Sequence, residues 1–213
     1  MPTPKVLVAG FGPFPGAPRN PSGELARNIA HSKRAARTGA KIVGIVIPTV
    51  YKEVFSTLSR ALKTERPDIV LLFGLAGGTP WMQIETRAAN IIGIHPDAAA
   101  EKPSDRSLIP GGMPFLNARA PAQRLVAAAR KASVTARLSA DAGRYICNAA
   151  FFHALHSAQK TGAPKLVAFV HIPSPRGRRP GKRRTRKIAP PSFAALQRAG
   201  EEVLLTLIAA ARD

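Results

Sequence analysis

The chain has 213 residues, 45% of them hydrophobic, which is enough to close the core of one domain, and we expect a single domain over residues 1–213. Its 32 Lys and Arg against 12 Asp and Glu give a formal charge of +20, which favours attraction to polyanions but does not decide the fold. No apolar run approaches the roughly 18 residues of a membrane helix and the N-terminus lacks the features of a secretory signal, so we expect a cytoplasmic protein without a membrane anchor.

The first half of the chain alternates apolar runs with amphipathic segments. Residues 5–10, KVLVAG, are a continuous apolar run ending in glycine, the pattern of a strand buried on both faces. Asn20 and Pro21 then supply an N-cap and a first-turn proline for a helix. The next segments read as strand, helix and strand, over residues 41–47, 51–64 and 68–74. This alternation predicts an α/β fold.

The second half continues this pattern around a long irregular stretch. In residues 82–88 apolar and polar side chains alternate, which predicts a strand with Gln83, Glu85 and Arg87 on its polar side. Prolines and glycines between residues 95 and 116 indicate a long loop. The remaining predicted elements are helices over 121–132, 146–160 and 192–211 and strands over 134–138 and 165–171.

A strongly basic stretch separates the last predicted strand from the last helix. Residues 176–187, RGRRPGKRRTRK, include eight Lys or Arg, and we expect a basic loop over about residues 174–190. The stretch has no aromatic side chain on which bases could stack, which argues against nucleic acid as a partner. Its positive charge raises the alternative of a catalytically impaired protein that binds peptides or polyanions through this loop.

The chain has a single cysteine, Cys147, so it cannot form an internal disulfide. A glycine turn leads into the predicted helix at 146–160 and places this thiol in the first helical turn. The unpaired N–H groups and partial positive charge at a helix N-terminus stabilise a thiolate and can stabilise an oxyanion. The alternative is a small buried core residue, because free cysteine is among the most buried residue types.

His171 and Glu85 are the residues that could work with such a thiol. His171 ends the predicted strand at 165–171, where catalytic groups of α/β sheets are commonly found. Taken singly, each residue is better explained as an ordinary polar residue than as a catalytic group. Together with Cys147 they supply a nucleophile, a proton acceptor and a carboxylate that fixes the imidazole tautomer, provided that the fold brings them together.

Five segments in order along the chain resemble the pyroglutamyl peptidases, also called pyrrolidone-carboxylate peptidases. They are VLVAGFGPFPGAPRNPS at 6–22, FGLAGGTPWMQIETRAANI at 73–91, SADAGRYICN at 139–148, FVHIPSP at 169–175 and PPSFAAL at 190–196. Several ordered motifs are far more specific than one. The resemblance implies a three-layer α/β/α sandwich with a mixed twisted sheet, no metal or organic cofactor, and a homo-oligomer, often a tetramer.

The resemblance also assigns roles to individual residues. It implies that Cys147 is the nucleophile, His171 its base and Glu85 the carboxylate that orients the histidine. The substrate is then a peptide with an N-terminal pyroglutamyl residue, which is released through a thiol acyl-enzyme. The residues expected near the pyroglutamyl ring are Phe11, Phe14, Asn20 and Tyr145. An apolar slot with few polar contacts suits a flat, uncharged lactam.

Two positions depart from the family pattern. Thr79 and Thr86 stand where the family often has arginine, which bears on substrate affinity and on the walls of the site.

Two other functions suggested by the sequence are weaker. A dinucleotide-binding motif needs a helix directly after its glycines, but prolines follow the glycines after the first strand. His153 and His156 could share a helix face, but no further zinc ligands accompany them.

Overall fold

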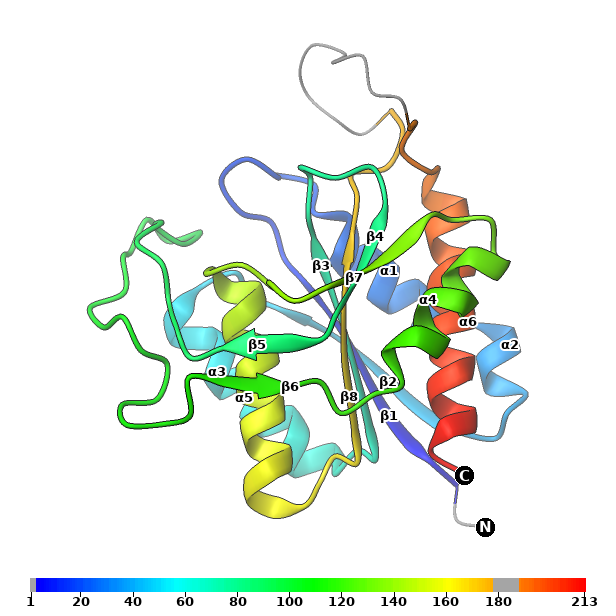
Figure 1. The fold of residues 1–213 in the computed structure, drawn as a ribbon, viewed down its shortest axis with the longest axis horizontal. Helices are drawn as coiled ribbons and strands as arrows, with labels where there is room; N and C mark the ends of the chain where they lie inside the picture. The colour runs from blue at the N-terminus through cyan, green and yellow to red at the C-terminus, as the bar shows by residue number, and fades with distance from the viewer. Residues whose placement is uncertain (1–2, 178–187) are drawn as a thin grey trace.

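The computed structural model describes residues 3–177 and 188–213, and Figure 1 shows their arrangement. The strands are β1 (Lys5–Phe11), β2 (Lys41–Ile47), β3 (Ile69–Leu75), β4 (Met82–Glu85), β5 (Arg87–Ala89), β6 (Phe115–Asn117), β7 (Ala136–Ser139) and β8 (Leu166–Ile172). The helices are α1 (Pro21–Ala30), α2 (Lys33–Ala36), α3 (Tyr51–Glu65), α4 (Ala122–Lys131), α5 (Ile146–Thr161) and α6 (Phe193–Ala210).

Six of the strands form one mixed sheet in the order β2-β1-β3-β8-β4-β7. The pairs β2–β1, β1–β3 and β3–β8 are parallel. Strand β4 runs antiparallel to β8 on one side and parallel to β7 on the other. The central strands β1, β3 and β8 are almost wholly buried, as their continuous apolar sequences predicted. Because these three strands run parallel, their carboxyl ends lie along the same edge of the sheet.

Helices cover both faces of this sheet and bury two separate apolar clusters. One cluster contains side chains of α1, α2, α4 and α6, and the other contains side chains of α3 and α5. Figure 1 shows the sheet between these two helix layers, with β5 and β6 on the side of α3 and α5. The predicted three-layer α/β/α architecture with a mixed sheet is confirmed.

The predicted strand over 82–88 is wrong in one respect, because the chain leaves the main sheet at Thr86. Thr86 donates its backbone N–H and its hydroxyl to the carbonyl oxygen of Ser139, at 2.7 and 2.9 Å. β7 ends at Ser139, so the ladder with β4 ends there too. The chain then forms β5, which pairs antiparallel with β6 in a separate two-stranded sheet.

Two short elements were not predicted. Helix α2 is a single turn capped by Ser32, whose hydroxyl accepts the N–H of Ala35 at 3.4 Å. Strand β6 lies at the end of the segment predicted as an irregular loop, where Leu116 is buried between exposed neighbours. Only the two ends of the basic loop predicted at 174–190 are described, and residues 178–187 lie outside the described residues. Within the described ranges, no helix is both long and apolar enough to cross a membrane.

Candidate active site

The predicted catalytic residues come from three elements that meet near one edge of the main sheet. His171 lies near the end of β8, and the strand register places it between Gly74 of β3 and Gln83 of β4. Glu85 is the last residue of β4, and Cys147 is the second residue of α5. Sequence positions that are far apart therefore converge on one site.

A tight turn delivers Cys147 to the start of its helix. Gly143 has φ of +80°, a left-handed conformation that glycine adopts without strain, and Asp141 Oδ1 accepts its N–H at 2.9 Å. Tyr145 is the N-cap of α5 and makes no side-chain capping bond. The first-turn N–H groups have no intrahelical partners, so they favour negative charge beside Cys147.

The absence of a side chain at Gly74 allows Cys147 and His171 to meet. A Cβ added to Gly74 would lie 2.9 Å from Cys147 Sγ, 2.9 Å from His171 Cδ2 and 2.8 Å from Phe169 Cζ. The thiol and the imidazole thus approach the same point on β3 from two sides. The Cys147 side chain is close enough to raise the pKa of the His171 imidazole. Gly74 was not singled out from the sequence, in which it is one of several glycines in FGLAGG.

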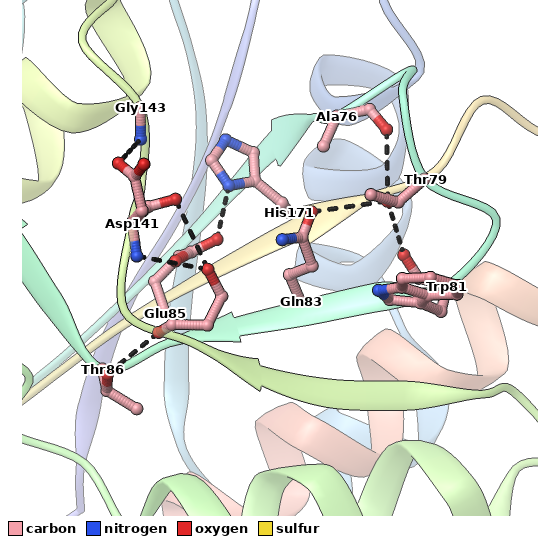
Figure 2. Close-up of polar contacts among 10 residues, drawn as sticks. Ala76, Thr79, Trp81, Gln83, Glu85, Thr86, Asp141, Gly143 and His171 are labelled. Atoms are coloured by element: carbon pink, nitrogen blue, oxygen red, sulfur yellow. Dashed lines mark hydrogen bonds and ion pairs between the residues drawn. The ribbon is translucent and has the colours of Figure 1, made fainter.

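Glu85 fixes the orientation of the imidazole. Its Oε1 lies 2.8 Å from His171 Nδ1, as Figure 2 shows, which leaves His171 Nε2 for the thiol. Glu85 is 1% exposed and His171 is 7% exposed, so water screens this contact weakly. Glu85 Oε2 is also buried and has no hydrogen-bond partner among the described residues. Glu85 is therefore not the solvated side chain that a polar strand face suggests.

His171 holds a proton at neutral pH. Burial alone would lower its pKa, but the hydrogen bonds from His171 to Cys147 and Glu85, together with the charges of these two groups, raise the pKa to about 9. An imidazolium ion pairs naturally with a thiolate, and the helix N-terminus stabilises the same negative charge. The site thus combines a protonated imidazole, oriented by a buried carboxylate, with a cysteine side chain at a helix N-terminus.

Protein stability should fall in mild alkali, because the folded state binds the His171 proton more tightly than the unfolded chain does. Protonated His171 stabilises the fold fully below its ordinary pKa of 6.5, and this contribution is lost as the pH rises through about 9. The loss is on the order of 3 kcal/mol in the free energy of unfolding. Urea unfolding at fixed protein concentration across this pH range measures it.

The matched variant for this measurement is Glu85→Gln, which keeps the side-chain shape and removes one of the charges that raise the pKa of His171. The variant should lose less unfolding free energy than the wild type over the same pH range. A wild-type unfolding free energy that stays constant between neutral pH and mild alkali would contradict the raised pKa.

Aromatic side chains cluster around Tyr145, two residues before Cys147. The rings of Phe14 and Tyr145 are 6.1 Å apart, and the rings of Tyr145 and Tyr51 meet edge to face at 5.6 Å. The Tyr145 hydroxyl donates to the carbonyl oxygen of Pro96 at 3.1 Å, which fixes its ring. The structure therefore places two of the predicted substrate-contact residues, Phe14 and Tyr145, together at the start of α5.

The other two predicted contact residues build the loop that carries Phe14. Phe11 is 1% exposed and packs against Phe169, with ring centroids 6.3 Å apart. The Asn20 side chain donates to the carbonyl oxygen of Gly12 at 2.9 Å and accepts the N–H of Ser22 at 3.1 Å. Asn20 is also the predicted N-cap of α1. In this structure, both residues hold the shape of the loop after β1.

A cavity of about 850 Å³ adjoins this region. It lies between the loop after β1 and the segment after β8, and its lining includes Phe11, Asn20, Leu75 and Ser174. Leu75 pairs with Ile172, the residue after His171, so one wall of the cavity lies near the end of β8, although Cys147, His171 and Glu85 are not among its lining residues. This space is large enough for part of a peptide.

The two threonines at the family's arginine positions form local hydrogen bonds. Thr79 Oγ1 donates to the carbonyl oxygen of Trp81 at 3.1 Å, while Thr86 Oγ1 donates to that of Ser139 at 2.9 Å. Figure 2 shows both threonines near β4, on either side of Gln83 and Glu85 along the chain. Thr79 shapes the turn before β4, and Thr86 shapes the departure of the chain from the main sheet.

The two histidines of α5 are engaged by neighbouring side chains. His153 Nε2 lies 2.7 Å from Ser59 Oγ, and the ring of His156 stacks on that of Phe152. Within residues 3–177 and 188–213, no group of three or more His, Cys, Asp and Glu side chains is arranged to hold a metal ion.

Comparison with known proteins agrees with this geometry. A family model described as pyroglutamyl peptidase matches residues 4–212. A pyrrolidone-carboxylate peptidase from Thermococcus kodakarensis is 37% identical over 170 residues, which cover 79% of this chain and 81% of the relative. Pyrrolidone-carboxylate peptidase 1 from Ralstonia nicotianae is 37% identical over 171 residues, covering 80% of this chain and 78% of the relative.

Solved structures show the same fold. A mutant pyrrolidone carboxyl peptidase from Pyrococcus furiosus has a TM-score of 0.88 at 27% identity, covering 97% of this chain and 99% of that one. Pyrrolidone carboxyl peptidase from Thermococcus litoralis has a TM-score of 0.87 at 27% identity, covering 97% of this chain and 94% of the other. The family model and the solved structures match nearly the whole chain, and the sequence relatives match 79% to 80% of it. The chain therefore belongs to the pyroglutamyl peptidase family.

Proposed function

We propose that this protein is a cysteine peptidase that removes the N-terminal pyroglutamyl residue from peptides and proteins. In this proposal Cys147 is the nucleophile, His171 its base and Glu85 the orienting carboxylate. The observation that carries it is the buried contact of Glu85 Oε1 with His171 Nδ1, at 2.8 Å, on an imidazole that meets the thiol of Cys147 beside Gly74. The alternative of an impaired binder is not favoured, because all three groups are present and in contact.

The reaction follows from this arrangement. Cys147 attacks the carbonyl carbon of the pyroglutamyl residue as a thiolate, while its proton is held on the imidazole of His171. N–H groups at the start of α5 stabilise the oxyanion, and the imidazolium protonates the departing amine of the peptide. The pyroglutamyl thioester on Cys147 is then attacked by water, which gives a proton to His171. Pyroglutamic acid leaves and the thiol is restored.

Recognition of the substrate requires a pocket for a flat lactam that carries no charge. Tyr145 lies two residues before Cys147, and with Phe14, whose ring is 6.1 Å away, it offers aromatic surface to such a ring. A free N-terminal glutamate carries two charges at the same place, and burying them against these rings would cost free energy. We therefore infer that Phe14 and Tyr145 select for the pyroglutamyl group, with Phe11 and Asn20 supporting their loop.

The chemistry uses only protein side chains and water, so the proposal includes no metal or organic cofactor. We place the protein in the cytoplasm, where a reducing environment preserves a reactive thiol. We also expect a homo-oligomer, with a tetramer as the specific form to test by light scattering.

The proposed activity is tested with fluorogenic amides of pyroglutamate, proline and glutamate under reducing conditions. Proline has the ring without the lactam carbonyl, and glutamate has the carbonyl atoms without the ring. We expect turnover of the pyroglutamyl amide and at least about 10²-fold lower kcat/KM for the other two, because buried polar and charged groups are left unpaired. A folded wild type that cleaves none of the three, or that cleaves the prolyl amide equally well, would contradict the proposal.

A further inference from the structure

Asn148 is a buried amide at the start of a helix whose neighbouring positions are apolar. It directly follows Cys147, is 0% exposed, and lies among the buried side chains of Ile146, Ala149 and Ala150. Burying an amide costs free energy unless its polar atoms are hydrogen-bonded. If this position only had to fill space, an apolar residue would serve better. The amide therefore indicates a specific requirement.

The polar atoms of the Asn148 side chain all bind the backbone of one segment. Its Oδ1 accepts the N–H of Ala89 at 2.9 Å, and its Nδ2 donates to the carbonyl oxygens of Ala89 at 2.8 Å and Ile91 at 3.0 Å. The paired bonds to Ala89 reproduce the donor and acceptor that a neighbouring strand would present to β5. Asn148 thereby fastens α5 to the end of β5.

The same segment is fastened to the chain on the other side of Cys147. We call residues 89–93 the strap. Its last residue, Gly93, donates its N–H to the carbonyl oxygen of Arg144 at 2.6 Å. A Cβ on Gly93 would lie 2.7 Å from that oxygen, so the two backbones are in close contact. The strap thus holds the chain at Arg144 and at Asn148, and Cys147 lies between these two anchors.

We propose that Asn148 is a positioning residue, which keeps the thiol of Cys147 in reach of His171 by fastening the first turn of α5 to the strap. The inference rests on the proposed function, because it concerns the geometry of that nucleophile. His171 is held separately, by β8 and Glu85, so movement of the helix start changes the distance between the two groups. Phe14 lies on a different loop, and the Tyr145 hydroxyl is held separately by the carbonyl oxygen of Pro96 at 3.1 Å, so binding of the pyroglutamyl ring is affected less than the chemical step.

The test compares Asn148→Ala with Asn90→Ala. Asn90 also lies in the strap and makes an equivalent pair of bonds, with its Nδ2 donating to Ile109 O and its Oδ1 accepting Ile109 N–H, both at 2.8 Å. Asn90 thus fastens the strap to the long loop instead of to α5. We expect Asn148→Ala to lower kcat for the pyroglutamyl amide by about 10²-fold with KM within about twofold, since misplacement by about 1 Å has that effect. Asn90→Ala should keep kcat within about threefold of the wild type.

A second readout does not depend on pyroglutamyl hydrolysis. The rate at which iodoacetamide alkylates Cys147 at neutral pH reports how well the thiol is paired with His171. We expect this rate to fall by about tenfold in Asn148→Ala and to stay unchanged in Asn90→Ala. If the wild type did not hydrolyse pyroglutamyl amides at all, the proposed function would fail, yet the difference in alkylation between the two variants would still test the role of Asn148.

Removing Asn148 leaves backbone groups unpaired, so circular dichroism and thermal unfolding must show that the variant is folded. If Asn148→Ala does not fold, Gly93→Ala disturbs the other anchor while keeping the amide, and the same selective loss of kcat and of alkylation rate is expected. The proposal is overturned if a folded variant of either anchor keeps wild-type kcat and alkylation rate, or if Asn90→Ala loses as much of both.

Discussion

Replacing Cys147 with Ala lowers kcat/KM for a pyroglutamyl amide by about 10⁴-fold or more, the loss expected when the nucleophile of a catalytic triad is removed. The chain has one cysteine, so no other thiol can take over its role. The side chain is small and only partly buried, so the fold should tolerate the change. Steady-state hydrolysis under reducing conditions measures the loss, with circular dichroism as the check on folding.

The control for this prediction is the double variant that carries both Cys147→Ala and His171→Ala. Residues that act as one catalytic unit give losses that do not add, because the second substitution removes a partner that has already lost its function. We therefore expect the double variant to be about as slow as Cys147→Ala alone. A further loss equal to that of the single His171→Ala variant would show that the two residues act independently. Full activity of Cys147→Ala would contradict its assignment as nucleophile.

Gly74→Ala should reduce kcat by about 10²-fold to 10³-fold without a matching rise in KM, because the added methyl displaces the reacting groups. Its Cβ would lie 2.9 Å from Cys147 Sγ and 2.9 Å from His171 Cδ2, closer than carbon can pack against either atom. The backbone of Gly74 is extended within β3, so alanine adds no conformational strain there. The loss therefore comes from the separation of thiol and imidazole, and stopped-flow turnover with KM measured in parallel detects it.

A matched control separates this effect from crowding of the core in general. Gly200 of α6 also lacks room for a methyl group, because a Cβ there would overlap Ile29 and lie 3.3 Å from Phe73 Cζ. Gly200→Ala should lower the free energy of unfolding by about 1–3 kcal/mol and leave kcat unchanged in the folded protein. If Gly74→Ala kept wild-type kcat, or if both variants lost kcat equally, the proposed close contact at Gly74 would be wrong.

Much of the fold follows from the apolar pattern of the sequence. Strands buried on both faces give continuous apolar runs, and β1, β3 and β8 agree with the predicted segments to within a residue or two. The break after Glu85 was not predicted, although the alternation of apolar and polar residues stops there, where Glu85, Thr86 and Arg87 are polar in succession. The break depends on hydrogen bonds to Ser139, which is distant in the sequence. Strand β6 could not be predicted for a similar reason, as its only pairing is with β5.

The candidate site divides in the same way. Cys147, His171 and Glu85 could be proposed from their motifs, because nucleophile, base and carboxylate are chemically distinctive residues. Gly74 and Asn148 could not be proposed from the sequence, because their roles depend on the groups that the fold places beside them. The signal for Gly74 is the space that it leaves for the side chains of other elements. The signal for Asn148 was present but weak, since one amide in an apolar helix start marks a buried polar contact without naming its partner.

Glu85 shows how far a local pattern can mislead. Alternation placed it on a polar strand face with Gln83 and Arg87, yet Gln83 is half-buried, Arg87 is exposed and Glu85 is 1% exposed. The difference arises because β4 lies inside the sheet and β5 lies outside it. Burial makes the carboxylate effective, because a charge shielded from water acts more strongly on the pKa of His171.

Acid-quenched mass spectrometry during turnover decides whether Cys147 carries the pyroglutamyl group. An activated pyroglutamyl ester would let the acyl-enzyme accumulate, since its alcohol leaves faster than an amine. We predict one pyroglutamyl group per chain on the peptide that contains Cys147, bound as a thioester that hydroxylamine removes. Turnover of the ester with no acyl group on Cys147, or with the group on another residue, would contradict the proposed mechanism.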